Sequence, residues 1–316
     1  MKKVSLGNSD IAIAPLVFGG NIFGWTVDKT QSFALLDALV DQGVNMVDTA
    51  NVYSAWVPGH QGGESESIIG DWLQSSGKRE QVVLASKVGM PMGDGSSGLS
   101  AANIVRSADA SLKRLKTDYI DVYYAHLDDR DTPFAESLEA FQTLIESGKV
   151  RAIASSNYDA DRLAECLQVA WDNGLPRFVA HQPEYNLYDR RGYEGKLEKV
   201  CKENGLGVVS YFSLASGFLS GKYRTAEDLA SSARRTMVDK YLTDRGLAIL
   251  AALDTIANRN QATLAATALA WIIHRDSVTA PIASATSMEQ LQELVNGATL
   301  ALSEDDMAML NAASDD

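Results

Sequence analysis

Side chains capable of proton transfer lie at the ends of successive β-branched or aromatic runs. Asp48, Lys87 and His126 each end one such run, and Tyr53 follows Asp48 within the next loop. A phenol with a reference pKa of about 10 exchanges protons poorly at neutral pH. Because a nearby cation lowers the pKa of a phenol, the sequence predicts that Lys87 tunes Tyr53.

These four residue types together point to carbonyl chemistry. Asp48 would keep Lys87 charged and aimed, and Tyr53 would donate a proton to an alkoxide that develops from a carbonyl. His126 would hydrogen-bond the carbonyl oxygen. No side chain supplies a hydride, so carbonyl reduction implies a nicotinamide cofactor. Each residue alone has an ordinary structural explanation, but their joint occurrence at successive strand ends favours a site.

Strand-like runs alternate with segments of helical period along the chain. The expected strands are Leu16–Gly19, Val44–Asp48, Val82–Lys87, Ile120–His126, Val150–Ser155, Phe178–Gln182, Val208–Phe212 and Val278–Ile282. The expected helices are Gln31–Gln42, Glu64–Leu73, Ala101–Leu115, Pro133–Glu146, Ala160–Asp172, Tyr193–Asn204, Arg245–Asn258, Leu264–His274, Met288–Asn296 and Ser303–Ala313. Eight such units predict a parallel sheet and favour a closed barrel over an open sheet.

Local signals predict how several segments begin and what they bury. Thr132 and Pro133 suit the N-cap and first position of a helix. Leu163, Leu167 and Trp171 are expected on one side of the following helix.

The N-terminus reads as a strand or hairpin. Lys2 and Lys3 precede the apolar run Ile11–Phe18, but the polar stretch Ser5–Asp10 separates them, which argues against a signal peptide. The expected fold class is therefore α/β, a (β/α)8 TIM barrel with an N-terminal β-hairpin and a C-terminal helix.

Length, composition and charge bound the class of protein. The 316 residues are 46% hydrophobic and 22% charged, which fits a single barrel domain over residues 1–316. A net charge of −13 argues against nucleic-acid binding. No run reaches the roughly 18 apolar residues of a membrane span, and Cys166 and Cys201 cannot form a disulfide framework. A cytoplasmic protein without a nucleic-acid or membrane partner is expected.

Six motifs follow one another over nearly the whole chain. They are Gly43-x-Asn-x-x-Asp-Thr-Ala-x-x-Tyr53, Leu84-Ala-Ser-Lys87, Asp121-x-Tyr-Tyr-x-His126, Ser155-Ser-Asn157, Gln182-Pro-Glu-Tyr-Asn186 and Ser216-Gly-Phe-Leu-Ser-Gly-Lys222. In this order they resemble the aldo-keto reductase family. Within it, the chain is similar to the branch that contains bacterial reductases and voltage-gated potassium channel β-subunits.

The resemblance implies a role for each matching position. Asp48, Tyr53, Lys87 and His126 would form the catalytic tetrad, with Tyr53 as general acid and base. The residues implied in cofactor binding are Gly20, Asn21, Asp48, Ser156, Asn157, Gln182, Tyr211, Leu214, Ser216, Lys222, Ser284, Thr286, Gln290 and Glu293. Among these, Ser156, Asn157 and Gln182 would hold the nicotinamide carboxamide, and Tyr211 would stack on the ring. The substrate pocket would be walled by Phe23, Trp25 and Trp56, and no metal is implied.

The resemblance also implies NADPH/NADP+ as cofactor, with NADH as the alternative. Many family members grip the 2′-phosphate with basic residues where this chain has Ala285, Thr286 and Gln290. The channel-β-like branch also uses Gln near this point, so NADPH stays the expectation. The phosphate would rest on hydroxyls, on N–H groups at a helix start, and on Lys222 or Arg234.

Other activities stay open from the sequence. A cofactor-binding, redox-sensing subunit with little turnover is the first alternative, although channel β-subunit-like proteins lack the tetrad histidine that is present here as His126. A Schiff-base aldolase using Lys87 is the second, and Asp48 argues against it. A metal-dependent barrel hydrolase is the third, opposed by the presence of only four histidines. The expected partner is a small carbonyl or alcohol substrate, aromatic or otherwise apolar. An oligomer stays open, because the family contains monomers and this branch contains larger assemblies.

Overall fold

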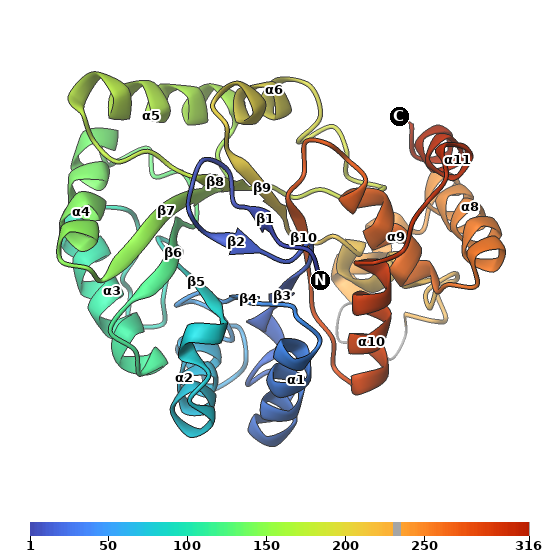
Figure 1. Cartoon of the computed structure of the whole chain (residues 1–316), viewed down its shortest axis with the longest axis horizontal. Coiled ribbons are helices and arrows are strands. Elements are labelled where there is room, and N and C mark those ends of the chain that lie inside the picture. Colours follow the sequence, from blue (N-terminus) through green and yellow to red (C-terminus); the bar gives the residue numbers. More distant parts are fainter. Residues whose placement is uncertain (230–234, 316) are drawn as a thin grey trace.

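Eight parallel strands close into a barrel (Figure 1). The computed structural model describes residues 1–229 and 235–315. The strands are β3 (Val17–Gly19), β4 (Met46–Asp48), β5 (Val83–Val88), β6 (Ile120–Ala125), β7 (Val150–Ser156), β8 (Ala180–Gln182), β9 (Gly207–Ser210) and β10 (Ala280–Ala283), and β10 pairs with both β3 and β9. The predicted barrel is thus confirmed, with strand bounds that shift by a few residues.

Helices surround the barrel. They are α1 (Lys29–Asp41), α2 (Glu64–Ser76), α3 (Ala101–Leu115), α4 (Phe134–Glu146), α5 (Ala160–Asn173), α6 (Lys196–Glu203), α7 (Arg235–Val238), α8 (Asp244–Asn260), α9 (Leu264–Ile273), α10 (Met288–Gly297) and α11 (Glu304–Ser314). Four 3-10 helices, η1 (Gly20–Ile22), η2 (Arg79–Gln81), η3 (Ala215–Ser220) and η4 (Asp239–Tyr241), lie in described loops. The sequence predicted neither α7 nor these short helices.

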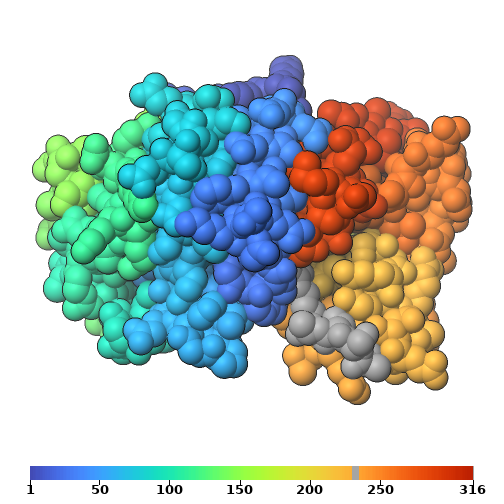
Figure 2. All heavy atoms as spheres, turned by 90° about the horizontal axis from the view of Figure 1, so that it is seen from below, coloured from blue at the N-terminus to red at the C-terminus, as the bar shows by residue number. Residues whose placement is uncertain are grey.

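The ring of helices closes where α1 lies next to α10. Gln31 of α1 donates from its Nε2 to the carbonyl oxygen of Thr286, just before α10, at 2.5 Å. In the space-filling view, the blue N-terminal segments meet the red C-terminal ones on this face (Figure 2).

The N-terminal hairpin closes one end of the barrel. Its strands β1 (Val4–Ser5) and β2 (Ala12–Ile13) pair antiparallel, and it lies across the middle of the view in Figure 1. Gly7, at φ +55°, lies so close to the start of β9 that a Cβ atom would sit 2.5 Å from the backbone nitrogen of Gly207. Because Leu6 and Ile13 pack with the side chains of the barrel interior, the hairpin plugs the N-terminal ends of the strands.

Alternation along each strand determines which side chains face the barrel interior. On β4, Met46 belongs to the interior cluster and Val47 to the layer between strands and helices. Since successive strand residues point to opposite faces, Asp48 faces the interior. By the same period of two, Lys87 follows the interior residue Ala85 on β5. The barrel thus directs the predicted polar side chains into its own C-terminal mouth.

Two local predictions are wrong. The N-cap of α4 is Pro133 rather than Thr132, and the Thr132 hydroxyl donates to Asp129 instead. Trp171 is 70% exposed, because the face of α5 that packs on the barrel is completed by the buried Ala170. At about 100° per residue, Ala170 lies within about 20° of Leu163 around the helix axis, whereas Trp171 lies about 80° away, at the edge of the packed face.

Candidate active site

A buried ion pair lies at the centre of the barrel mouth. Lys87 Nζ lies 2.5 Å from Asp48 Oδ2, and the two side chains are 0% and 1% exposed. Asp48 ends β4, and Lys87 lies on β5 beside it in the sheet. Removal of either charge would leave the other buried without compensation, so the two residues stabilise each other in place.

Lys87 uses all three of its ammonium protons. Besides Asp48, its Nζ donates to the carbonyl oxygen of Thr49 at 2.8 Å and to Tyr53 Oη at 2.9 Å. Burial lowers the pKa of Lys87, and the Asp48 carboxylate opposes that shift. An ammonium with three acceptors has no lone pair to attack a carbonyl, which argues against the aldolase alternative.

Tyr53 lies on the loop after β4 and is held by its neighbour Ser54. Ser54 adopts a left-handed conformation (φ 72°), and its hydroxyl donates to the carbonyl oxygen of Phe23 at 2.8 Å. The Tyr53 hydroxyl accepts from Lys87 and donates to Asp48 Oδ2 at 3.3 Å. The phenol therefore meets both members of the ion pair.

The pKa of Tyr53 corrects one prediction. Burial, followed by the Asp48 carboxylate, raises the pKa of Tyr53 well above its usual value of 10.0. The sequence predicted a lowering by Lys87, but desolvation and Asp48 outweigh that cation. Tyr53 is therefore a neutral phenol with a proton to give, which suits a general acid.

His126 is a neutral imidazole beside the phenol. Its ring centroid lies 6.0 Å from that of Tyr53, edge to face. Burial and the positive charge of Lys87 lower the pKa of His126 well below 6.5. Its Nδ1 is buried and has no hydrogen-bond partner among the described residues. A buried, unpartnered ring nitrogen is a group that a bound molecule can satisfy.

Hydroxyl and amide groups from β7 and β8 join the same cluster. Gln182 Nε2 donates to Asp48 Oδ1 at 3.0 Å, and the Ser156 hydroxyl donates to the carbonyl oxygen of Gln182 at 2.8 Å. Asn157 Nδ2 donates to the carbonyl oxygen of His126, while Asn157 Oδ1 accepts from the Tyr211 hydroxyl, both at 2.8 Å. All four residues were predicted at the cofactor site. Together they offer amide donors and acceptors of the kind that a carboxamide requires.

The remaining predicted cofactor residues lie further along the rim. The hydroxyl of Ser284, which follows β10, lies 2.8 Å from both the carbonyl oxygen of Gly19 and Asn21 Oδ1, beside Gly20, and can donate its single proton to either oxygen. The N–H group of Thr286 donates to Gln290 Oε1, and Glu293 is half-buried on α10. Leu214 and Ser216 lie in the loop that holds η3. Lys222 follows this loop, and its Nζ lies 5.0 Å from the centroid of the Tyr223 ring. Arg234, an expected phosphate contact, lies outside the described residues.

Two indole rings lie beside the phenol. Trp25 and Trp56 meet edge to face at 5.6 Å, and the Trp56 centroid lies 6.1 Å from that of Tyr53. Trp56 is 48% exposed, so it presents an aromatic surface to solvent next to the phenol. Phe23 does not join this wall: it is fully buried and stacks on Phe18 in the core.

Comparison with known proteins identifies the family. Residues 15–315 match the model of the aldo/keto reductase family. The chain belongs to the aldo/keto reductase family. It is 34% identical to an uncharacterized oxidoreductase, YrpG, of Bacillus subtilis, over 98% of this chain and 95% of that protein. It is 32% identical to a probable voltage-gated potassium channel subunit beta of Arabidopsis thaliana (93% and 90%), and 30% identical to norsolorinic acid reductase stcV of Emericella nidulans (94% and 77%).

Membership of the aldo/keto reductase family supports oxidoreductase activity on carbonyls, with a nicotinamide cofactor. The predicted resemblance and barrel are thereby confirmed. No helix in the described ranges 1–229 and 235–315 is long and apolar enough to cross a membrane. Nor do those ranges contain three His, Cys, Asp or Glu side chains grouped as metal ligands.

Three groups at or beside the active site of this aldo/keto reductase were not predicted from the sequence. The Thr49 acceptor is a backbone carbonyl, which no side-chain pattern reveals. Glu66 is fully buried on α2, where it accepts from Ser86, the residue before Lys87, and from Arg114. Tyr124 faces the barrel interior beneath the tetrad. The sequence signal for Tyr124 is its position two residues before His126, because residues two apart on a strand face the same side.

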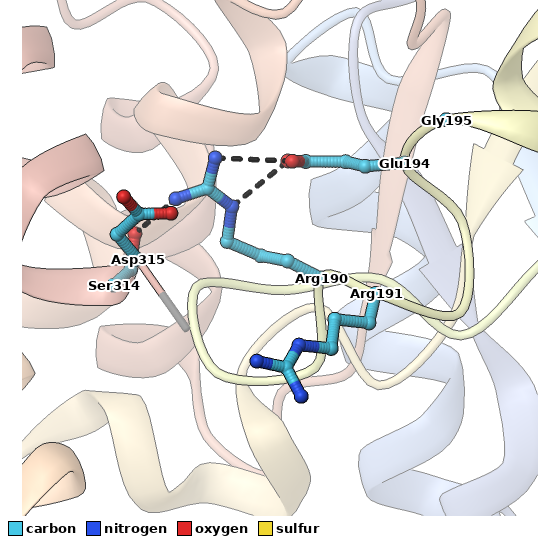
Figure 3. A pocket seen from close by; sticks show the side chains of 6 residues that line it. All are labelled: Arg190, Arg191, Glu194, Gly195, Ser314 and Asp315. Atoms are coloured by element: carbon cyan, nitrogen blue, oxygen red, sulfur yellow. Dashed lines mark hydrogen bonds and ion pairs between the residues drawn. The ribbon is translucent and has the colours of Figure 1, made fainter.

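A separate hollow lies on the outer wall, between the loop after β8 and α11 (Figure 3). It is lined by Arg190, Arg191, Glu194, Gly195, Ser314 and Asp315. Arg190 donates to Glu194 through Nε and Nη2 and to Ser314 Oγ through Nη1. These bonds tie the C-terminal helix to the loop, so Arg190 has a structural role in the fold.

Proposed function

We propose that the protein reduces aldehydes or ketones to alcohols, reversibly, with NADPH. The observation that carries this proposal is the hydrogen-bonded set Asp48–Lys87–Tyr53, in which a neutral phenol lies against a buried ammonium. This set supports proton donation to a carbonyl oxygen, and membership of the family supports the hydride chemistry.

The chain's own residues would hold the nicotinamide cofactor, which supplies the hydride when bound. Ser156, Asn157 and Gln182 present the hydroxyl and amide groups that fit its carboxamide. Tyr211, held by Asn157, would stack on the ring. Gly20, Asn21, Leu214, Ser216, Lys222, Ser284, Thr286, Gln290 and Glu293 would hold the remainder of the cofactor.

The proton step would proceed between Tyr53 and the substrate oxygen. The neutral His126 donates a hydrogen bond to the carbonyl oxygen and fixes its position. As charge develops on that oxygen, Tyr53 Oη transfers its proton there. The phenolate left behind lies 2.9 Å from Lys87 Nζ, which stabilises the negative charge. In the reverse direction the same phenolate takes the proton back.

We further propose a cofactor preference, a substrate class and a cellular compartment. We propose NADPH over NADH, with the 2′-phosphate at the start of α10, whose N-cap is Ser287. Trp25 and Trp56 favour an aromatic or apolar carbonyl. The described Cys166 and Cys201 are free, which fits the cytoplasm. Residues 1–316 would act as one domain, alone or in an oligomer.

The test is the loss of nicotinamide absorbance with an activated aromatic aldehyde, run with NADPH and NADH in parallel. We expect oxidation of NADPH, little oxidation of NADH, and one alcohol formed per cofactor consumed. Equal rates with both would contradict the cofactor preference but leave the reductase proposal standing. Tight cofactor binding without oxidation across aldehydes and ketones would contradict the reductase proposal and favour a sensing subunit.

A further inference from the structure

Tyr124 presents a buried hydroxyl without a partner next to the catalytic ion pair. Its side chain is 0% exposed, and Oη has no hydrogen-bond partner among residues 1–229 and 235–315. Burial of a polar group without a hydrogen bond is costly, so a hydroxyl in this position needs an explanation.

The register of the barrel directs this hydroxyl toward the tetrad. Tyr124 of β6 pairs with Lys87 of β5, and the Lys87 ammonium lies 5.8 Å from the centroid of the Tyr124 ring. Tyr124 belongs to the interior cluster, one interior position before His126. Besides the burial of the ring, the Asp48 carboxylate raises the pKa of Tyr124, so the phenol is a neutral donor. The Gln182 side chain lies close enough to the Tyr124 hydroxyl to oppose that rise, at a geometry that falls short of a full hydrogen bond.

The hydrogen bonds of Asp48 show where that donor is needed. Asp48 Oδ2 accepts from Lys87 and Tyr53, whereas the described donor to Asp48 Oδ1 is Gln182 alone, at 3.0 Å. Under the proposed function, on which this inference rests, Gln182 is also a ligand of the cofactor carboxamide. A Gln182 that turns toward the cofactor leaves Asp48 Oδ1 without its donor in a buried site.

We infer that Tyr124 is a positioning residue: its hydroxyl replaces Gln182 as donor to Asp48 Oδ1 when Gln182 engages the cofactor. The replacement keeps the carboxylate fully hydrogen-bonded and thereby keeps Lys87 aimed at Tyr53. The hydroxyl is unpartnered before the cofactor binds and partnered afterwards, so part of the binding free energy comes from satisfying it.

Tyr124→Phe should change the stability of the cofactor-free protein and the affinity for NADPH in opposite directions. Tyr124→Phe removes the unpartnered hydroxyl, so the cofactor-free protein should melt at a higher temperature than the wild type. The same change should weaken NADPH binding about tenfold, because a hydrogen bond to a charged group is lost only in the complex. Tryptophan fluorescence quenching gives the Kd, and differential scanning calorimetry gives the Tm.

Tyr123→Phe is the matched control. Tyr123 is also fully buried on β6, but it faces the helices and lies 6.0 Å from the ring of Phe141. Its substitution should leave the Kd for NADPH unchanged. An unchanged Kd in Tyr124→Phe, or equal weakening in both variants, would overturn the inference. Failure of the wild type to bind NADPH would instead contradict the proposed function.

A double-mutant cycle tests the replacement without any cofactor. In Gln182→Ala, Asp48 Oδ1 has lost its donor, so the Tyr124 hydroxyl should already serve it. Tyr124→Phe should therefore lower the Tm in the Gln182→Ala background, although it raises the Tm in the wild-type background. If Tyr124→Phe changed the Tm in the same direction in both backgrounds, Tyr124 would not replace Gln182.

Discussion

Replacement of Lys87 by Met tests the buried ion pair. Methionine keeps the unbranched shape but removes the ammonium and its three hydrogen bonds to Asp48, Thr49 and Tyr53. Asp48, 1% exposed, would then be a buried carboxylate without a cation. It would retain Gln182 at 3.0 Å and Tyr53 at 3.3 Å as donors.

The size of the expected loss of stability follows from leaving the Asp48 carboxylate buried without a cation. Breaking a buried ion pair by removing one partner costs about 3–5 kcal/mol, so we expect Lys87→Met to lose about that much of its free energy of unfolding at neutral pH. A lone buried carboxylate has a raised pKa. The folded variant then binds more protons than its unfolded chain, so its deficit should shrink as the pH falls toward 5.

The assay is urea denaturation of Lys87→Met, of Lys78→Met and of the double variant Asp48→Asn with Lys87→Met. Lys78 pairs with Asp37 at 2.7 Å, but the Asp37 side chain is 48% exposed, so losing this pair should cost less than about 1 kcal/mol. Asp48→Asn should recover most of the stability lost in Lys87→Met, because it removes the orphaned charge. A Lys87→Met protein as stable as Lys78→Met, or a double variant without recovery, would refute the reasoning.

Two further predictions concern the outer layer and the pocket wall. Burial lowers the pKa of His181 from 6.5 to about 3, so the unfolded chain binds the proton first and stability falls as the pH drops below 6.5. Between about pH 7.5 and 4.5, the His181→Gln variant should lose ~3 kcal/mol less of its free energy of unfolding than the wild type does, as measured by urea denaturation. An equal loss in both proteins would contradict the lowered pKa of His181. Trp56→Ala should raise the KM for aromatic aldehydes about tenfold and leave kcat and the Tm nearly unchanged, since Trp56 is 48% exposed. An unchanged KM would show that the indole does not contact substrate.

Regular features of the fold could be predicted because their causes are local. Helix α3 occupies Ala101–Leu115 as expected, since its apolar spacing and basic last turn are readable in the sequence. The barrel followed from alternating segments, and the convergence of Asp48 and Lys87 followed from their positions at strand ends. Parallel strands that share one mouth make strand-end residues neighbours whatever their separation in sequence.

Features that depend on burial could not be read in the same way. The pKa of Tyr53 is raised because desolvation exceeds the effect of Lys87, and the depth of a side chain appears only once the barrel closes. The exposure of Trp171 depends on which edge of α5 meets the sheet. The third acceptor of Lys87 is a carbonyl oxygen at Thr49, so residue type carries no signal for it.

The role of Tyr53 as proton donor is the central claim, and Tyr53→Phe tests it most directly. The variant loses the hydroxyl that lies 2.9 Å from Lys87 Nζ and leaves Ser156, Asn157 and Gln182 in place. We predict an unchanged Kd for NADPH by fluorescence and a rate of aldehyde reduction that falls by roughly 10²–10⁴-fold in single turnovers. A reduction rate within a few-fold of the wild type, with the cofactor bound normally, would contradict the account.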